Sequence, residues 1–311
     1  MACPRGGRKD CRLGARMVAK RRRSEWPRGP FAWHTDESSY ASIPFTWNLA
    51  ETHAIFKELT IFPRPTFVGG PAVELMPGFF ADIPGVVEGH TFPGILQMVN
   101  PLATRTTTGC MRRCTFCGVG SGKIETGGFS ELADWPDLPI ICDNNLLAAS
   151  TAHFDRVLDR LEHWTGADFN QGIDARLLTA HHAQRFARLR KPSIPLALDS
   201  MAYADSWGAA FDLLRSAGVV LDSIRSLVLV GLDSGPDEAW ERCRWITAHG
   251  VKACPMWFHR LDAMEWNAVT TEQTALGWDD EKRKDIMAYF YYHRDRRIRR
   301  GRCRLTAEAE L

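Results

Sequence analysis

The sequence predicts an α/β fold in which β-strands alternate with α-helices around a parallel sheet. Two observations support this prediction. From Thr104 onward, short apolar runs alternate with stretches whose apolar residues recur at helical spacing. The chain of 311 residues is also 45% apolar and 24% charged, which is ordinary for a globular protein with a substantial core. Strands and helices in this alternation are typical of βα units, whose chemistry lies at the carboxyl ends of the strands.

Two segments precede this alternation. Residues 1–30 hold ten Lys or Arg against two acidic residues and few large apolar side chains, so they are expected to be disordered. Residues 31–103 are rich in Pro, Gly and aromatic residues, with a helix expected at 48–59 and a strand at 66–70. They are predicted to form a small α/β accessory segment.

The expected elements of the core follow one another between residues 104 and 264. In residues 151–165, Phe154, Val157 and Leu161 recur on one helical face. Strands are expected at 104–109, 138–144, 168–178 (a strand and a turn), 193–200, 224–234 and 251–259, and helices at 151–165, 179–190, 206–218 and 236–250. Residues 265–311 are expected to form a basic C-terminal extension with a helix at 279–300.

Charge and hydropathy limit the location and partners that we expect. The sequence contains no run of about 18 or more apolar residues, and its basic N-terminus lacks the apolar core of a secretory signal. A cytoplasmic protein without membrane contact is therefore expected. The net charge is +2, but residues 294–304 hold seven Arg against one Asp. Basic ends of this kind are typical of solvated tails, and binding of a nucleic acid is the alternative.

The stretch TRTTTGCMRRCTFCG, residues 104–118, places three of the nine cysteines within eight residues. These are Cys110, Cys114 and Cys117. In a reducing compartment such a cluster favours a metal or redox site over a disulfide framework. Simple packing of the thiols on a helix is disfavoured, because threonines and glycines flank them.

Two kinds of metal site agree with this triplet. A structural zinc ion would need a fourth ligand, and Cys142 would supply it if the fold brought it close. An iron–sulfur cluster held by three thiolates would instead leave one iron open for another ligand. Arg112 and Arg113 would then offset the negative charge of the thiolates, and Phe116 would supply an apolar wall.

The spacing C-x3-C-x2-C in CMRRCTFC, with an aromatic residue before the last cysteine, resembles the signature of the radical S-adenosylmethionine (radical SAM) superfamily. The resemblance covers roughly residues 104–264 and implies a partial (β/α)6 TIM-like barrel. It implies that the three cysteines ligate a [4Fe-4S] cluster, whose fourth iron is chelated by S-adenosylmethionine. An electron donor such as a flavodoxin or ferredoxin would reduce the cluster. Cleavage of S-adenosylmethionine would then give methionine and a 5′-deoxyadenosyl radical, which abstracts hydrogen from a substrate.

The resemblance also implies contacts to S-adenosylmethionine at the ends of the second and third strands. A Gly-Gly-Glu-like segment usually contacts the methionine amino group, and CDNN stands in its place here, so the contact would come from Asp143, Asn144 or Asn145. The alternative for these three residues is a helix cap or turn. The segment DFNQGIDARLL resembles the third-strand region of cobalamin-dependent and methylthiotransferase-like members. Arg176 there would bind a carboxylate of the substrate or of methionine, or would lie on the surface.

Later strand ends complete the expected cofactor site. The resemblance places polar contacts to ribose or methionine at Asp199 and Ser200, and a backbone approach to adenine at Gly231. Ordinary turn chemistry is the alternative for each of these residues.

The accessory segment and the number of cysteines restrict which subgroup of the radical SAM superfamily the sequence resembles. Residues 67–90 resemble the end of a cobalamin-binding domain, but the D-x-H-x-x-G segment of that domain is absent, so a remnant without bound cobalamin is expected. The sequence has no second cysteine triplet, which disfavours methylthiotransferase chemistry. The substrate is not identified by these motifs. The competing hypothesis is a zinc-stabilised, non-enzymatic protein that binds nucleic acid through its Arg-rich ends.

Overall fold

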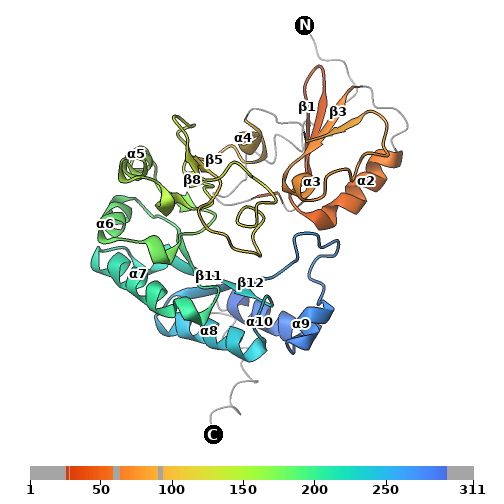
Figure 1. The fold of residues 1–311 in the computed structure, drawn as a ribbon. Coiled ribbons are helices and arrows are strands. Elements are labelled where there is room, and N and C mark those ends of the chain that lie inside the picture. Colours follow the sequence, from red (N-terminus) through yellow and green to blue (C-terminus); the bar gives the residue numbers. More distant parts are fainter. Residues whose placement is uncertain (1–25, 28, 59–63, 90–93, 293–311) are drawn as a thin grey trace.

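The structure is a computed structural model that describes residues 26–27, 29–58, 64–89 and 94–292 (Figure 1). The basic residues 1–25, the arginine-rich residues 294–304 and the end of the expected 279–300 helix lie outside these ranges. Disorder of the N-terminus and nucleic-acid binding by the basic ends therefore stay predictions. In the described ranges, no helix has both the length and the apolar character that crossing a membrane requires.

The accessory segment forms a four-stranded sheet beside the parallel strands (Figure 1). Its strands, in spatial order, are β1 (Phe31–His34), β2 (Ser39–Ser42), β3 (Thr66–Gly69) and β4 (Val86–Glu88). The first pair is antiparallel and the other two pairs are parallel. The helices α2 (Leu49–Glu58) and α3 (Pro71–Leu75) accompany the sheet. A separate apolar cluster that includes Ile43, Leu49, Val68 and Phe80 forms its core.

Six parallel strands follow in two sheets of three. The first sheet contains β5 (Ala103–Thr104), β8 (Ile140–Ile141) and β9 (Asp168–Phe169), and the second β10 (Ile194–Ala197), β11 (Ile224–Val230) and β12 (Lys252–Trp257). Two isolated parallel bridges, Asp168 with Ser193 and Ile173 with Leu196, connect β9 to β10. The strands therefore lie side by side in sequence order, and among the described residues they do not close into a barrel. The α/β class is confirmed.

The first three strands are much shorter than the sequence predicts. The expected strand 104–109 is divided into β5 and β6 (Thr107–Thr108), and β6 pairs with β7 (Ser130–Glu131) instead of with the parallel strands. The division has a local cause, because the carboxylate of Asp143 accepts the backbone N–H groups of Thr106 and Thr107. After β9 the chain turns at Gly172, whose φ of +94° favours glycine.

Helices cover one face of the parallel strands in an arc (Figure 1). They are α5 (Thr151–Leu161), α6 (Ala180–Arg188), α7 (Ala204–Ser216) and α8 (Pro236–Ala248), each within a few residues of its predicted range. Burial alternates along β11, where Val228 and Val230 are buried and Leu227 and Leu229 are only partly buried. The buried side chains belong to the main apolar core, which they share with the helices.

The C-terminal segment also joins this core. The helix α10 (Asp280–Tyr292) contacts β12 and α8, while the short helices α4 (Ile95–Val99) and α9 (Thr271–Ala275) lie outside the arc. Trp278 and Ile286 are buried in the same cluster as the helices α5 to α8. The sequence assigns these residues to an extension, yet their burial makes them part of the main core.

Candidate metal centre and its polar network

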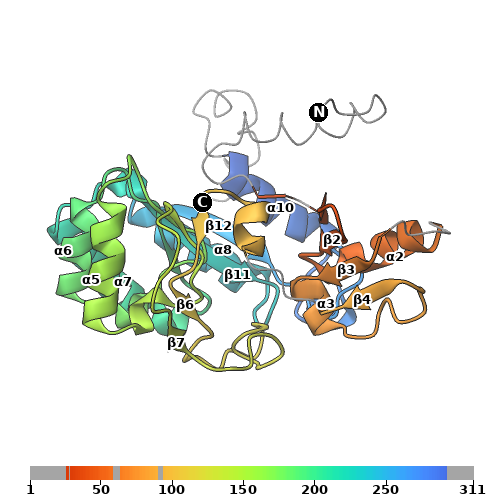
Figure 2. The ribbon, with the colours of Figure 1, turned by 90° about the horizontal axis from the view of Figure 1, so that it is seen from above.

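The cysteines lie in the loop that joins β6 to β7, inside the arc of helices and close to the accessory segment (Figures 1 and 2). The antiparallel pair of Thr107–Thr108 with Ser130–Glu131 closes the loop at its base. Inside this pair, a Cβ on Gly109 would lie only 1.9 Å from the carbonyl oxygen of Gly128. Gly109 also has φ of +66°, so the closure requires a glycine at this position.

Glu125 ties the loop to the strands. Its carboxylate accepts two hydrogen bonds from the guanidinium of Arg105 at 2.6 and 2.8 Å, one from the backbone N–H of Gly109 at 2.9 Å and one from the Asn144 amide at 2.8 Å. Burial alone would raise the pKa of the Glu125 carboxyl, but the bonds from Arg105 and Gly109 outweigh it and hold the pKa below its usual value. The backbone φ of Glu125 is +50°, which is strained for a residue other than glycine. The four hydrogen bonds to its carboxylate hold the residue in that conformation.

All three cysteines are half-buried free thiols. The N–H of Cys117 donates to the carbonyl of Cys114 at 3.2 Å, and a Cβ on Gly120 would come within 2.7 Å of the Cys114 nitrogen. Burial raises the pKa of the Cys114 thiol, and the negative potential of Cys117 and Cys110 adds to the rise. Cys117 and Cys110 therefore lie near enough to Cys114 to affect the pKa of its thiol.

Among the described residues, the arrangement of the donor side chains does not form a site for a single metal ion. In the part of the chain that the structure describes, no three His, Cys, Asp or Glu side chains are placed to ligate one metal ion, as structural zinc requires. A [4Fe-4S] cluster binds each thiolate through a different iron, so its thiolates need not converge on one centre. The backbone N–H of Arg112 also donates to the sulfur of Cys110 at 3.4 Å, a bond that stabilises thiolate charge.

Cys142, the fourth ligand that a zinc site would need, lies in an apolar environment. It is buried with Ala103 and Ile140, and Trp26 packs against this cluster. Burial, and then the negative charge of Asp143, raise the pKa of the Cys142 thiol to about 12. Cys142 therefore belongs to a small apolar cluster that does not include Cys110, Cys114 or Cys117.

Asp174 connects the cysteine loop to the turn that follows β9. Its carboxylate accepts hydrogen bonds from Arg112 at 2.8 Å, from Arg176 at 2.7 and 3.1 Å, and from the Asn145 amide at 3.4 Å. Burial alone would raise the pKa of Asp174, but Arg176 and then Arg112 outweigh it and hold the pKa low. Arg176 also lies over the ring of Tyr203, 4.7 Å from its centroid. Both arginines are therefore paired with Asp174. Because Asp174 already balances part of the charge of Arg112, this arginine is not wholly available to offset the charge of the thiolates.

Asp143 stabilises the segment before the cysteine loop. It is buried, and it accepts hydrogen bonds from the backbone of Thr106 at 2.6 Å and of Thr107 at 3.0 Å, and from the Thr106 hydroxyl. Burial raises the pKa of Asp143 although these bonds oppose the rise. They occupy both carboxylate oxygens with partners 36 and 37 positions away in the chain, which is neither the helix cap nor the turn given as the alternative for this residue.

The two asparagines after Asp143 have different surroundings. The Asn144 amide nitrogen donates to Glu125 at 2.8 Å and to the Gly109 carbonyl at 3.4 Å, which holds the loop base. Asn145 is buried with 4% exposure, and its side-chain oxygen has no hydrogen-bond partner among the described residues. An unsatisfied buried acceptor beside the cysteine loop is available to a donor group of a ligand.

Asp199 lies at the carboxyl end of β10, in the electrostatic neighbourhood of Cys114. Burial raises the pKa of the Asp199 carboxyl, a rise that Arg242 and Arg176 oppose. The fully buried Arg242 donates to the backbone carbonyl of Asp199 and, at 2.7 Å, to the hydroxyl of Ser234. Arg242 thereby holds the carboxyl ends of β10 and β11 together.

The remaining predicted site residues are explained by local structure. The Ser200 hydroxyl accepts from the backbone of Ala202 at 3.3 Å and caps a short helix. Gly231 has φ of +82°, and a Cβ there would lie 2.7 Å from the ring of Trp257. Phe116 is half-buried in the cysteine loop. These contacts neither require nor prevent an additional contact to a ligand.

Sequence reasoning missed the two acids that organise the site, Glu125 and Asp174. Glu125 is an isolated acid in a glycine-rich loop, and no periodicity identifies it. Asp174 precedes a short 3₁₀ helix and accepts from the backbone of Arg176, a capping pattern that the sequence ID-AR could have indicated. The pairing of these acids with arginines distant in the chain has no signal in the spacing.

The sequence matches no model of a known protein family and no curated protein. The interpretation of the site therefore depends on the cysteine loop and on the strands that carry it.

Proposed function

We propose that this chain is a radical SAM enzyme. The proposal depends mainly on the loop of residues 109–128, which carries Cys110, Cys114 and Cys117, all three of them half-buried free thiols. The Gly109–Gly128 contact and the four hydrogen bonds of Glu125 fix its base. Rigid presentation of three soft thiolates is what a cluster with one open iron needs.

The arrangement of the strands supports the finer fold proposal, a partial (β/α)6 barrel of the radical SAM type. Six parallel strands lie in sequence order, and helices cover one of their faces. The cysteine loop and Asp199 follow the carboxyl ends of strands, where α/β proteins of this kind place their chemistry.

The chain's own residues have separable tasks in this proposal. Cys110, Cys114 and Cys117 would hold a [4Fe-4S] cluster. Such a cluster, reduced by a donor such as a flavodoxin or ferredoxin, supplies a 5′-deoxyadenosyl radical from S-adenosylmethionine for hydrogen abstraction. The free oxygen of Asn145 suits the methionine ammonium. Arg176 would bind the methionine carboxylate in exchange for part of its pairing with Asp174.

The contacts of the other predicted residues suggest a narrower set of cofactor ligands than the sequence predicts. Asp143 and Asn144 already use their polar groups inside the protein, so they would support the site without contacting S-adenosylmethionine. Asp199 and the backbone at Gly231 would lie along the carboxyl edge.

Anaerobic reconstitution with iron and sulfide tests this proposal. We expect the wild type and Cys142→Ala to take up about four irons per chain. Cys114→Ala should lose the cluster while keeping the fold, which circular dichroism would check. Cys142→Ala is the matched control, because this cysteine lies outside the loop and the zinc alternative needs it. One bound zinc that depends on Cys142, with no iron uptake, would support the nucleic-acid-binding alternative instead.

A further inference from the structure

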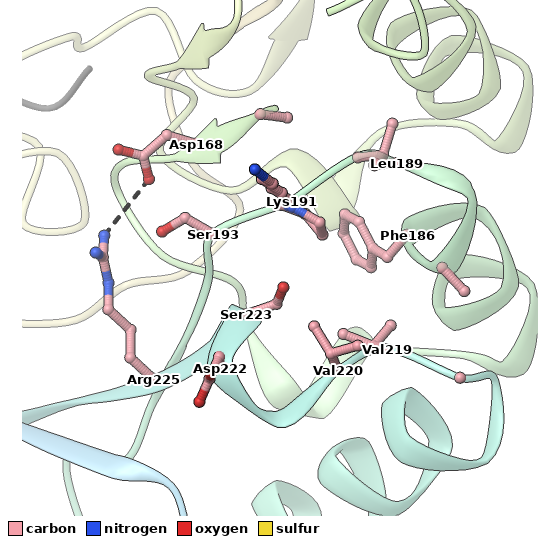
Figure 3. A pocket seen from close by; sticks show the side chains of 14 residues that line it. Asp168, Phe186, Leu189, Lys191, Ser193, Val219, Val220, Asp222, Ser223 and Arg225 are labelled. Atoms are coloured by element: carbon pink, nitrogen blue, oxygen red, sulfur yellow. Dashed lines mark hydrogen bonds and ion pairs between the residues drawn. The ribbon is translucent and has the colours of Figure 1, made fainter. Parts of the chain in front are cut away.

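A pocket of about 580 Å³ opens at the amino ends of the parallel strands, away from the cysteine loop (Figure 3). Residues at the starts of β9, β10 and β11 line it, together with the segments that follow α6 and α7. Its volume lies within the range of about 300–1,000 Å³ that is usual for small-molecule sites. The pocket is therefore separate from the site at the carboxyl ends of the strands.

The lining is divided into a polar and an apolar side (Figure 3). Phe186, Leu189, Val219 and Val220 lie on one side, and Asp168, Ser193 and Arg225 lie on the other. Such a division fits a small molecule that has an apolar body and a polar end. A purely apolar ligand would leave the polar side without partners.

The polar side retains unused hydrogen-bonding capacity. Asp168 is 4% exposed and its ion pair with Arg225 is a single contact of 3.5 Å, looser than a bidentate pair. The buried Nε of Arg225 has no hydrogen-bond partner within the described part of the chain. In the same part, the hydroxyl groups of Ser193 and Ser223 also donate and accept no side-chain hydrogen bond.

Lys191 contributes a second cation to the pocket. It has φ of +44°, a left-handed conformation that is unusual for a residue other than glycine. In Figure 3 the nitrogen at the end of its side chain lies toward Asp168, and the residue as a whole is exposed. Lys191 and Arg225 are matched by the carboxylates of Asp168 and Asp222, so the charged lining is balanced.

We propose that this pocket binds a zwitterionic α-amino acid with an apolar side chain. The carboxylate of the ligand would bind Arg225 and Lys191, its ammonium would bind Asp168, and its side chain would lie against Phe186 and Val220. A ligand of zero net charge suits a balanced lining, and both of its charged groups have a partner. This binding is independent of the radical SAM proposal, because no residue of the pocket belongs to the cysteine loop or its network.

Binding is tested with leucine and three matched analogues, by calorimetry and thermal unfolding. Isoamylamine lacks the carboxylate, 4-methylpentanoate lacks the ammonium, and glycine lacks the apolar side chain. We expect saturable binding of leucine, with each analogue weaker by about tenfold or more. Leucine at one hundred times its Kd should raise Tm by about 5 °C. Leucine and phenylalanine that both fail to saturate at millimolar concentration would overturn the proposal, as would equal binding of leucine and 4-methylpentanoate.

Two pairs of variants separate binding from folding. Lys191→Gly removes the ammonium but also relieves the strain of the left-handed backbone. It should therefore keep the Tm of the wild type and lower the affinity for leucine by about tenfold or more. Asn267→Gly, at φ of +60° outside the pocket, is its control. Val220→Asp charges the apolar side at a residue that is 60% exposed, and Ile55→Asp is the control at 52% exposure. Unchanged leucine affinity in both pocket variants would contradict the proposal.

Discussion

The two halves of the parallel strands are stabilised by different interactions. In the half that carries the cysteines, β5, β8 and β9 have two residues each, and the carboxylates of Asp143, Glu125 and Asp174 bind the segments between them. In the other half, β11 alone has seven residues, and helices bury its apolar side chains.

This difference separates two physical requirements. The second half depends on the volume and shape of apolar side chains, as protein cores generally do. In the first half, Ile141 and Phe169 belong to the same apolar core, and charged hydrogen bonds in addition fix irregular backbone that no strand ladder stabilises. The cysteines lie in the half where polar contacts determine the structure. Substitutions should therefore affect the two halves in different ways.

The largest effect should follow removal of a core side chain in the second half. Trp207 is fully buried, stacks on Phe211 and donates its indole N–H to Ser226 at 3.1 Å. Trp207→Ala should lower the free energy of unfolding by about 3–5 kcal/mol, because it leaves a cavity. Urea unfolding measures the change. The control is Trp266→Ala, at 68% exposure, which should stay within about 0.5 kcal/mol of the wild type. Equal losses in the two variants would contradict the account of the core.

A smaller loss should follow removal of the buried carboxylate in the first half. Asp143→Ala leaves the N–H groups of Thr106 and Thr107 without their acceptor, at a cost of about 1–3 kcal/mol in the free energy of unfolding. Asp143→Asn keeps one oxygen acceptor and should lose less. Chemical unfolding of both variants gives the comparison. An Asp143→Ala variant as stable as the wild type would show that these bonds are dispensable.

Glu125→Gln should act mainly on the cysteine loop. It removes the charged partner of Arg105, with a loss of about 1 kcal/mol in local stability and a rise of about fivefold in loop opening. The rate at which a maleimide labels the loop thiols in the native protein reports this opening. Glu265→Gln, at an exposed acid, is the matched control. Equal labelling rates in the two variants would show that Glu125 does not hold the cysteine loop closed.

The smallest effect should be the pH dependence of stability. The pKa values of Glu125 and Asp174 are lowered in the folded state, so their contribution is present above the unfolded values of 4.5 and 3.8 and is lost as pH falls through the folded values. The pKa of Asp143 is raised, so its protonation favours the folded state as pH falls. Below pH 4.5, Glu125→Gln should therefore lose less stability than the wild type. Parallel acid unfolding curves for the two proteins would contradict this assignment.

The sequence predicts the helices and the long strand β11 better than the first three strands for a physical reason. Helices such as α5 and α6 and the long strand β11 follow from apolar periodicity, because burial determines both the pattern and the structure. The first strands are shorter than expected because Asp143 takes N–H groups that a ladder would have used. Periodicity does not reveal such side-chain acceptors.

The candidate site shows the same division. Spacing identifies the three cysteines as a group, and strand ends place Asp199 and Gly231 at the carboxyl edge. The spacing does not reveal that Asp174 forms an ion pair with Arg112, which lies 62 positions earlier in the chain, or that Glu125 forms one with Arg105. Those contacts depend on how the turns bring distant segments together.

Cleavage of S-adenosylmethionine is the direct test of radical SAM activity. The reconstituted protein is incubated anaerobically with dithionite and S-adenosylmethionine, and 5′-deoxyadenosine is measured by chromatography. We expect release of 5′-deoxyadenosine by the wild type and by Cys142→Ala, and none by Cys114→Ala. A wild-type protein that holds a full [4Fe-4S] cluster and releases no 5′-deoxyadenosine, or a Cys114→Ala variant that releases as much as the wild type, would contradict it.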